Sequence, residues 1–187
     1  MTHKKLKTLE EARFDLLQKV NKLIESEWDN SPKKSKIIRY EIALKSAHPL
    51  EWLILQDCSK KVFWENRNQK EQFAGIGSAL DFKDGKEGYG KILFEIVNLL
   101  RNSPKSIRFF GGARFDLKAN SSPEWRDWGA SIFTLPMVEL SIINEKITLA
   151  CHISTGDGII KKLRDLKNTL LSMRVEDISI PDNPIIR

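Results

Sequence analysis

Apolar residues recur at helical spacing in three stretches of the chain, and charged residues occupy the opposite face of each stretch. This pattern predicts helices over residues 8–28, 90–101 and 159–173. The first helix begins with a capping box, in which Thr8 precedes Glu11 by three residues. Asn-Ser-Pro follows the first two stretches, at residues 30–32 and 102–104, and indicates where each helix stops.

Alternating apolar and polar residues predict strands between these helices. Strands are expected over residues 36–44, 62–64, 73–80, 107–110, 131–135, 137–143 and 146–153. Pro136 separates two of them, and Asn144-Glu145 joins the last two as a hairpin. Residues 50–55 fit either a short helix or a strand. The order of helix, strands, helix, strands and helix favours an α+β fold, in which an antiparallel β-sheet carries helices packed on one face.

The length of 187 residues is typical of a single domain with a short appendage. We expect an N-terminal helix and linker over residues 1–35 and an α+β core over residues 36–173. Residues 174–187 contain two prolines and no helical period. They are therefore expected to form an extended connector.

The composition is that of a soluble globular protein, with 41% hydrophobic and 30% charged residues. No apolar run approaches the ~18 residues that a membrane span requires, and the N-terminus lacks the apolar core of a signal peptide. Cys58 and Cys151 lie far apart in apolar stretches, which is typical of reduced core thiols. We therefore expect a cytoplasmic protein without a membrane partner.

The formal net charge is +6, and lysines cluster at residues 4–7, 33–36 and 161–162. Such clusters usually form solvated surface, so nucleic-acid binding is not expected. A small anionic substrate is compatible with the charge. The charge alone does not select a function.

The stretch from residue 107 to residue 139 is the most distinctive part of the chain. Gly111-Gly112 interrupts a β-prone run, and paired glycines there indicate positive φ or a close approach of backbone. Trp125 and Trp128 follow, and we expect their indole rings to pack over bare backbone. Because buried aromatic residues usually belong to a core, the stretch is interpreted as architecture and not as a site.

Residues with catalytic potential are scattered. The histidines His3, His48 and His152 have no metal-ligand spacing, and a histidine within a strand is more often a hydrogen-bonded structural residue. Cys58 has no histidine close to it in sequence, so a nucleophilic dyad is not supported. Three acidic residues lie in a lysine-rich turn and are better explained by a solvated loop than by a cation site. They are Asp81, Asp84 and Glu87.

Two further features allow a ligand interpretation. Arg114 and Asp116 can orient a carboxylate ligand, because a guanidinium fork suits that geometry, but a structural ion pair that holds the loop is favoured. The glycine-containing stretch 154–158 precedes the last helix, and backbone at a helix N-terminus can hold a phosphate. Asp157 argues against a phosphate, because its carboxylate is better explained as the helix cap.

Six landmarks occur in order along the chain. They are PLEWL at residues 49–53, VFW at 62–64, FAGIGSA at 73–79, RFFGGARFD at 108–116, EW at 124–125 and FTLPMVE at 133–139. This series resembles the N-terminal half of the isochorismate synthases, which belong to the chorismate-utilising enzymes with the anthranilate, aminodeoxychorismate and salicylate synthases. The resemblance covers about residues 37–153. The GGARFD segment with the downstream FTLP and glutamate points to the isochorismate branch.

The resemblance implies a magnesium-dependent isomerase that converts chorismate to isochorismate. In such enzymes a lysine activates water, a glutamic acid protonates the departing hydroxyl group, and other glutamates bind Mg²⁺. The resemblance places these groups in the C-terminal half of the family's enzymes. We therefore predict no catalytic, cofactor-binding or metal-binding residue in this chain, and we expect an inactive N-terminal fragment of a longer enzyme.

The resemblance also implies half of the two-sheet fold of chorismate-utilising enzymes, which is the fold of anthranilate synthase component I. Without a partner half, the inner sheet face is expected to be bare and apolar, so we predict self-association through it. Menaquinone or phylloquinone biosynthesis is slightly preferred over siderophore biosynthesis. Two alternatives stay open: a fragment of a salicylate or anthranilate synthase, and a stand-alone binding or regulatory domain without catalysis.

Overall fold

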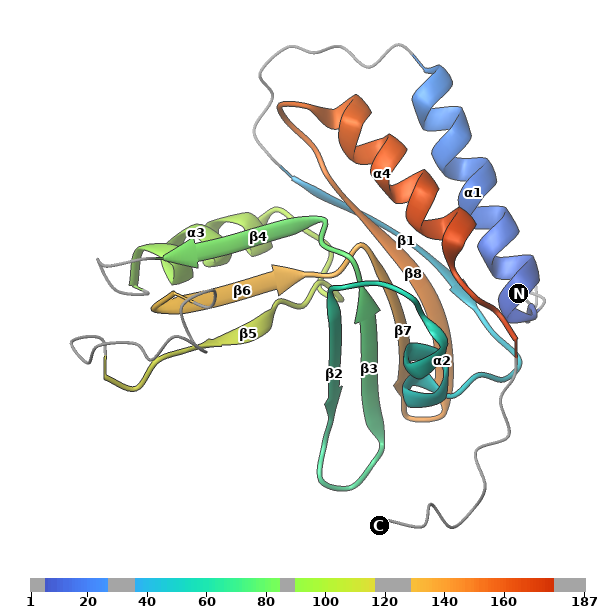
Figure 1. Ribbon diagram of the computed structural model, residues 1–187, viewed down its shortest axis with the longest axis horizontal. Helices are drawn as coiled ribbons and strands as arrows, with labels where there is room; N and C mark the ends of the chain where they lie inside the picture. The colour runs from blue at the N-terminus through green and yellow to red at the C-terminus, as the bar shows by residue number, and fades with distance from the viewer. Residues whose placement is uncertain (1–5, 27–35, 85–89, 117–128, 177–187) are drawn as a thin grey trace.

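The computed structural model describes residues 6–26, 36–84, 90–116 and 129–176, which form an α+β fold, as the sequence predicts (Figure 1). The helices are α1 (Leu9–Glu25), α2 (Pro49–Leu55), α3 (Gly90–Arg101) and α4 (Ile159–Ser172). The strands are β1 (Ile37–Ala43), β2 (Lys61–Glu65), β3 (Glu71–Ile76), β4 (Leu80–Asp84), β5 (Phe110–Ala113), β6 (Ser131–Leu135), β7 (Val138–Ile143) and β8 (Lys146–Ser154).

The strands form two antiparallel sheets and not the single sheet that the sequence pattern indicates. The larger sheet has the order β1-β8-β7-β3-β2, and the smaller sheet has the order β4-β6-β5. In Figure 1 the strands of the smaller sheet run across the direction of β2 and β3. The two sheets therefore meet at an angle, and the chain passes between them twice.

The first passage follows β3. The sequence predicts one strand over residues 73–80, but β3 ends at Ile76 and β4 begins at Leu80 in the other sheet. Gly77 has a φ of +66°, a left-handed conformation that favours glycine, and it turns the chain between the two strands. Hydrophobic residues continue on both sides of this turn, so periodicity alone does not reveal it.

The second passage lies at Pro136, which separates β6 from β7 as predicted. Proline has no N–H to donate to a strand ladder, so it suits a point where one sheet ends. The two passages are hydrogen-bonded to each other. The Ala79 N–H donates to the Leu135 carbonyl at 2.9 Å, and the Met137 N–H donates to the Ile76 carbonyl at 3.0 Å.

The central glycine pair lies inside β5 and does not interrupt a strand, whereas residues 107–109 precede the strand. A Cβ on Gly111 would lie 1.9 Å from the Ile132 carbonyl oxygen of β6. The predicted close approach of backbone is therefore confirmed at this position. A Cβ on Gly112 would meet nothing within 4 Å. The tryptophans expected to pack nearby, at 125 and 128, lie outside the described residues.

The helices agree with the sequence pattern to within three residues at their ends. The capping box of α1 is present: the Glu11 N–H donates to Thr8 Oγ1 at 3.2 Å, and the Thr8 N–H donates to Glu11 Oε2 at 2.8 Å. The helix ends at Glu25, before the predicted residue 28. Residues 50–55 take the helical alternative, as part of α2.

The main hydrophobic core lies between α1, α4 and one face of the larger sheet (Figure 1). Leu16 of α1 and Leu163 and Leu170 of α4 are fully buried there. The Arg13 guanidinium also donates from α1 to the Met173 carbonyl at 3.0 Å. Helices near the two ends of the described chain therefore pack together, as do strands β1 and β8. No helix within the described residues is long and apolar enough to cross a membrane.

The opposite face of the larger sheet is polar at its centre, so the expectation of a bare apolar face is wrong there. Strand alternation places Arg39 of β1, Glu139 and Ser141 of β7, and Thr148 and His152 of β8 on this face. The last four residues are buried, and the Arg39 side chain is only 3% exposed. Their interactions form the candidate site described below.

The close approach at β5 predicts unequal effects of two neighbouring substitutions. Gly111→Ala should destabilise the protein by roughly 1–3 kcal/mol, because the new methyl group overlaps the backbone of β6. Gly112→Ala is the matched control and should change the free energy of unfolding by no more than about 0.5 kcal/mol. Urea denaturation of both variants measures the difference, and equal stabilities would contradict the close approach.

Candidate functional site

A buried cluster of charged side chains lies on the polar face of the larger sheet. The antiparallel register places Arg39 of β1 directly opposite His152 of β8, and Glu139 lies on the next strand. The Arg39 guanidinium donates to Glu139 Oε1 at 3.0 Å through Nη1 and to Glu41 Oε2 at 3.1 Å through Nε. One arginine thus connects residues of β1 and β7 across β8.

The His152 imidazole is held as a neutral ring. Its Nδ1 lies 2.8 Å from the Pro136 carbonyl oxygen, which can only accept, so Nδ1 carries the hydrogen. Nε2 is then an acceptor for Arg39 Nη1, at 2.6 Å. Burial, together with the charge of Arg39, lowers the pKa of His152 to about 3. The preference for a hydrogen-bonded structural histidine is therefore confirmed for His152.

The Glu139 carboxylate is completely buried. Burial raises its pKa, although the charges of Arg39 and Arg108 act in the opposite direction. The Arg108 Nη1 atom lies 3.9 Å from Glu139 Oε1, and its guanidinium lies 4.1 Å from the centre of the Phe73 ring. Glu139 Oε2 has no hydrogen-bond partner. The contacts of Arg108 connect the cluster on the larger sheet to the segment before β5.

A groove of about 630 Å³ runs between the edge strand β2 of the larger sheet and the strands β5 and β6 of the smaller one. It is lined by Ser59, Lys60, Lys61, Val62, Phe63, Trp64, Gly77, Phe110, Gly111, Gly112, Ile132 and Thr134. Phe63 and Trp64 are exposed large hydrophobic residues. Gly111, whose bare backbone the approach of β6 requires, also lines this groove.

Asp81 lies beside the groove. The expectation that it belongs to a turn is wrong, because it lies in β4, although the residue is exposed to solvent as expected. Its carboxylate pairs with Lys60 and accepts hydrogen bonds from Ser78 Oγ at 2.6 Å and Thr134 Oγ1 at 2.8 Å. Burial opposes its ionisation, but these hydrogen bonds prevail and lower its pKa. Asp84 also lies in β4, and residue 87 lies outside the described residues.

The other residues singled out in the sequence do not assemble into a catalytic group. Cys58 and Cys151 are free thiols, as predicted, and burial raises the pKa of Cys151 to about 12. His48 occupies the N-cap position of α2 without a side-chain cap bond, and residue 3 lies outside the described residues. The Arg114 N–H donates to the Ala130 carbonyl at 2.8 Å, and the expected pairing of its side chain with Asp116 stays a prediction.

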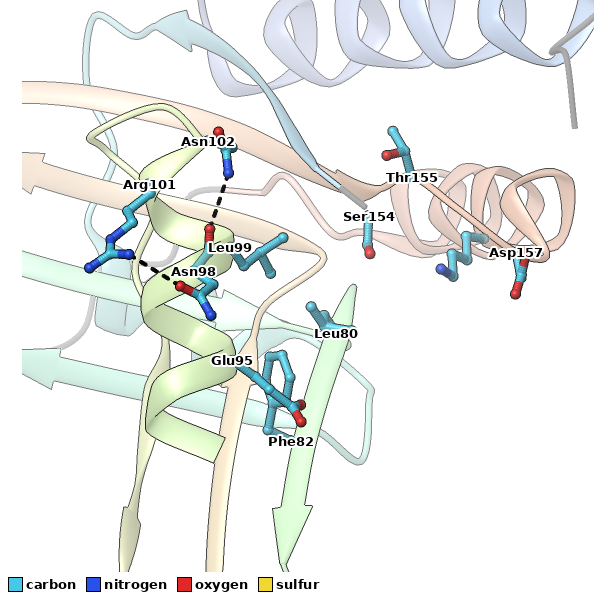
Figure 2. Close-up of a pocket in the computed structure, with 11 residues that line it drawn as sticks. Leu80, Phe82, Glu95, Asn98, Leu99, Arg101, Asn102, Ser154, Thr155 and Asp157 are labelled. Carbon is cyan, nitrogen blue, oxygen red and sulfur yellow. Dashed lines mark hydrogen bonds between the residues drawn. The ribbon is translucent and has the colours of Figure 1, made fainter. Parts of the chain in front are cut away.

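A second cavity, of about 780 Å³, lies between α3, β4 and the start of α4 (Figure 2). Leu80 and Phe82 of β4 and Leu99 of α3 form its apolar wall. Ser154 and Asp157 border the opposite side. The expectation that Asp157 caps α4 is wrong, because the N-cap residue is Gly158 and no side chain caps this helix.

The sequence pattern did not reveal the charged cluster, although one signal was present. Arg39 and Glu139 each occupy a strand position whose side chain points away from the main core, and such positions are usually interpreted as solvent-facing. Only the fold shows that the segment around Arg108 covers them. Within the described residues, no three histidine, cysteine, aspartate or glutamate side chains come together in a way that could hold a metal ion.

Comparisons with known proteins give consistent results. The family model described as chorismate binding enzyme matches residues 18–182. The chain is 28% identical over 86 residues to a chloroplastic isochorismate synthase of Catharanthus roseus, which covers 46% of this chain and 15% of that protein. It is 33% identical over 81 residues to the chloroplastic isochorismate synthase 2 of Arabidopsis thaliana, which covers 43% of this chain and 14% of that protein.

Among solved structures, the chain is similar to MenF, the menaquinone-specific isochorismate synthase of Escherichia coli. The TM-score is 0.61 at 19% sequence identity, so the likeness is one of fold. It covers 89% of this chain and 35% of MenF. The chain therefore spans about a third of MenF, and its matches span a smaller share of the plant relatives.

The neutral state of His152 predicts a specific pH dependence. The ordinary pKa of 6.5 falls to about 3 in the folded protein, so the unfolded chain binds the proton more tightly. Stability supplied by this group is complete above pH 6.5 and decreases as the pH falls below it, by at most roughly 1.4 kcal/mol per pH unit. Glu139, whose pKa is raised, acts with the opposite sign.

His152→Asn isolates this effect, because it removes the titrating ring and keeps an N–H donor. Near pH 7.5 the variant should be about 1–3 kcal/mol less stable than the parent protein. The difference should narrow as the pH falls from 6.5 to 5. His48→Asn, at the exposed start of α2, should follow the parent profile. Denaturant titrations across this pH range measure the difference, and a gap for His152→Asn that does not vary with pH would refute the assignment.

Proposed function

This chain belongs to the chorismate-binding enzyme family, whose model matches residues 18–182, and we propose that it is the N-terminal, non-catalytic part of an isochorismate synthase. Such an enzyme is an isomerase that converts chorismate to isochorismate. One observation carries the proposal: nearly all of this chain corresponds in fold to about a third of MenF. Both plant relatives are named isochorismate synthases, which supports the same assignment. MenF is named as menaquinone-specific, which supports a role in the menaquinone pathway.

In this proposal the chain forms one wall of the enzyme. Its buried charges support that role, because Arg39 makes its hydrogen bonds to Glu41, Glu139 and His152. A guanidinium that is used in this way holds strands together and is not available to orient a substrate. A cytoplasmic location stays a prediction.

Magnesium does not fit the described residues, since they contain no cluster of carboxylate, imidazole or thiol groups that could hold a metal ion. Asp81, the carboxylate beside the groove, already accepts hydrogen bonds from Lys60, Ser78 and Thr134. In this proposal, Mg²⁺ and chorismate bind to a companion segment of the enzyme. That this chain contributes no group to the reaction stays a prediction.

The surface that suits such a companion is the groove between the sheets. Strands β2 and β5 stand at the edges of their sheets, so each presents backbone N–H and C=O groups that a further strand can pair with. The side chains of Phe63 and Trp64 add exposed apolar surface at β2. When the companion segment is absent, a second copy of this chain can occupy the same surface.

The purified chain should form no isochorismate from chorismate in the presence of Mg²⁺. MenF, assayed under the same conditions, is the positive control, and product is measured by liquid chromatography. Turnover by this chain alone would overturn the proposal that the reactive groups lie outside it. The reading frame after codon 187 gives an independent test, because the lysine and glutamates that the family uses should be encoded there.

The isolated chain should self-associate through the β2 edge of the larger sheet. Trp64→Lys should shift the population toward monomer, because a lysine at an edge strand opposes strand pairing. Phe14→Lys, at an exposed position of α1 far from this edge, is the control and should leave association unchanged. Sedimentation velocity at several concentrations measures both, with circular dichroism to verify folding. A parent chain that is monomeric at the highest concentration would contradict this surface.

A further inference from the structure

Helix α2 is apolar on its outward side as well as on the side that packs against the larger sheet. Its sequence is PLEWLIL, in which Glu51 is the only polar residue. Trp52 and Leu53 are buried in the main core, whereas Leu50 and Ile54 are 38% and 58% exposed. Residues four positions apart lie on the same side of a helix, so these two exposed side chains form an outward stripe. A helix that is hydrophobic all round is usually covered on both sides, so the stripe is expected to have a partner.

The chain that follows α4 is attached to the end of this helix. The side chain of Gln56, the C-cap residue of α2, accepts from the Arg174 N–H at 2.9 Å and donates to the Arg174 carbonyl at 3.0 Å. The same amide group donates to the Trp52 carbonyl at 2.8 Å, and Gln56 is only 4% exposed. Val175 then packs against the main core. The described chain therefore reaches Glu176 beside the C-terminal end of α2.

The sequence that continues from this point is apolar in a matching pattern. Residues 177–187, DISIPDNPIIR, lie outside the described residues and contain four isoleucines. Two of them, Ile178 and Ile180, are two positions apart, and extended backbone would place them on one side, about 6.8 Å apart along the chain. The two prolines of this segment favour extended backbone. Leu50 and Ile54 are about 6 Å apart along the axis of α2, so the two pairs of side chains have similar spacing.

Reach and contact area favour this segment over a second copy of the chain. From Gln56 to Leu50 the axis of α2 rises by about 9 Å, and an extended segment of the length of 177–187 spans up to about 36 Å. Two exposed side chains are far less than the about 800 Å² per partner that a stable interface between separate chains buries. A tethered segment does not need such an area, because its attachment gives it a high effective concentration at the stripe.

We propose that residues 177–187 dock in an extended conformation on the outward stripe of α2. The segment runs from the C-terminal end of the helix toward its N-terminal end. Ile178 packs on Ile54. Ile180 packs on Leu50, one helical turn further along. Docking removes both pairs of apolar side chains from water. The contact uses only residues of this chain, so its failure would leave the proposed function untouched.

NMR spectroscopy of the full chain tests the contact directly. Nuclear Overhauser effects should connect the methyl groups of Ile178 with those of Ile54, and the heteronuclear Overhauser values of residues 177–180 should equal those of α2. A sample that mixes labelled and unlabelled copies distinguishes contacts within one chain from contacts between chains. Overhauser effects that are absent, or that occur only between copies, would overturn the proposal.

A double-mutant cycle gives an independent test. Ile54→Ser and Ile178→Ser should each lower the folding equilibrium constant by about tenfold, because each removes one side of the contact. The double variant should lose far less than about a hundredfold, since both changes remove the same interaction. Urea denaturation measures all three variants. Single losses of about twofold or less, or losses that multiply fully, would refute the contact.

Val97→Ser is the matched control for Ile54→Ser. Val97 is also a β-branched residue on the outward side of a helix, and it is 46% exposed. Its helix, α3, lies against the smaller sheet and away from α2 in Figure 1. The substitution should change the folding equilibrium constant by about twofold or less, and this change should be independent of Ile178→Ser. Equal losses in Val97→Ser and Ile54→Ser would show that the stripe of α2 has no special partner and would overturn the proposal.

Discussion

The structure depends on one corner, where the chain passes twice between two sheets that meet at an angle. Gly77 turns the first passage, Pro136 interrupts the second, and backbone hydrogen bonds join the two. A Cβ on Gly75 would lie 2.5 Å from the Pro136 ring, so the proline packs directly on bare backbone of β3. The Pro136 carbonyl in turn accepts from His152. This corner fixes the angle between the sheets. It therefore also fixes the shape of the groove beside β2 and of the cavity between α3, β4 and α4.

The charged cluster beside that corner contributes more to selecting a single strand register than to the stability of the fold. Removing two ions from water costs several kcal/mol, and a buried pair recovers this only with good geometry. Here Arg39 satisfies partners from three strands, whereas Glu139 Oε2 has none. A strand shifted by one residue would turn Arg39 into the hydrophobic core, so the cluster enforces the register of β1 on β8. This role in fixing the register accounts for the charged side chains on a sheet face that was expected to be apolar.

Local signals in the sequence predicted local structure well. The capping box of Thr8 and Glu11, the hairpin at Asn144-Glu145 and the break at Pro136 are all present, because each is determined by a few neighbouring residues. Local signals could not predict the division into two sheets. The residue pattern of 73–80 is the same whether its two halves join one sheet or two. The charged cluster and the uncapped α4 were missed for a related reason: burial of Arg39, and the failure of Asp157 to reach the helix, depend on tertiary packing.

The pairing of β1 with β8 sets the order in which the molecule can fold during synthesis. Arg39 and His152 are separated by 113 positions, and Arg13 and Met173 by 160, so the centre of the larger sheet joins early and late parts of the chain. Hairpins such as β2–β3 and β7–β8 need only short loops and form first. Until β8 and α4 emerge from the ribosome, β1 lacks its partner strand and α1 lacks the helix against which it packs. Folding is therefore completed late, and nascent chains are most prone to association just before this point.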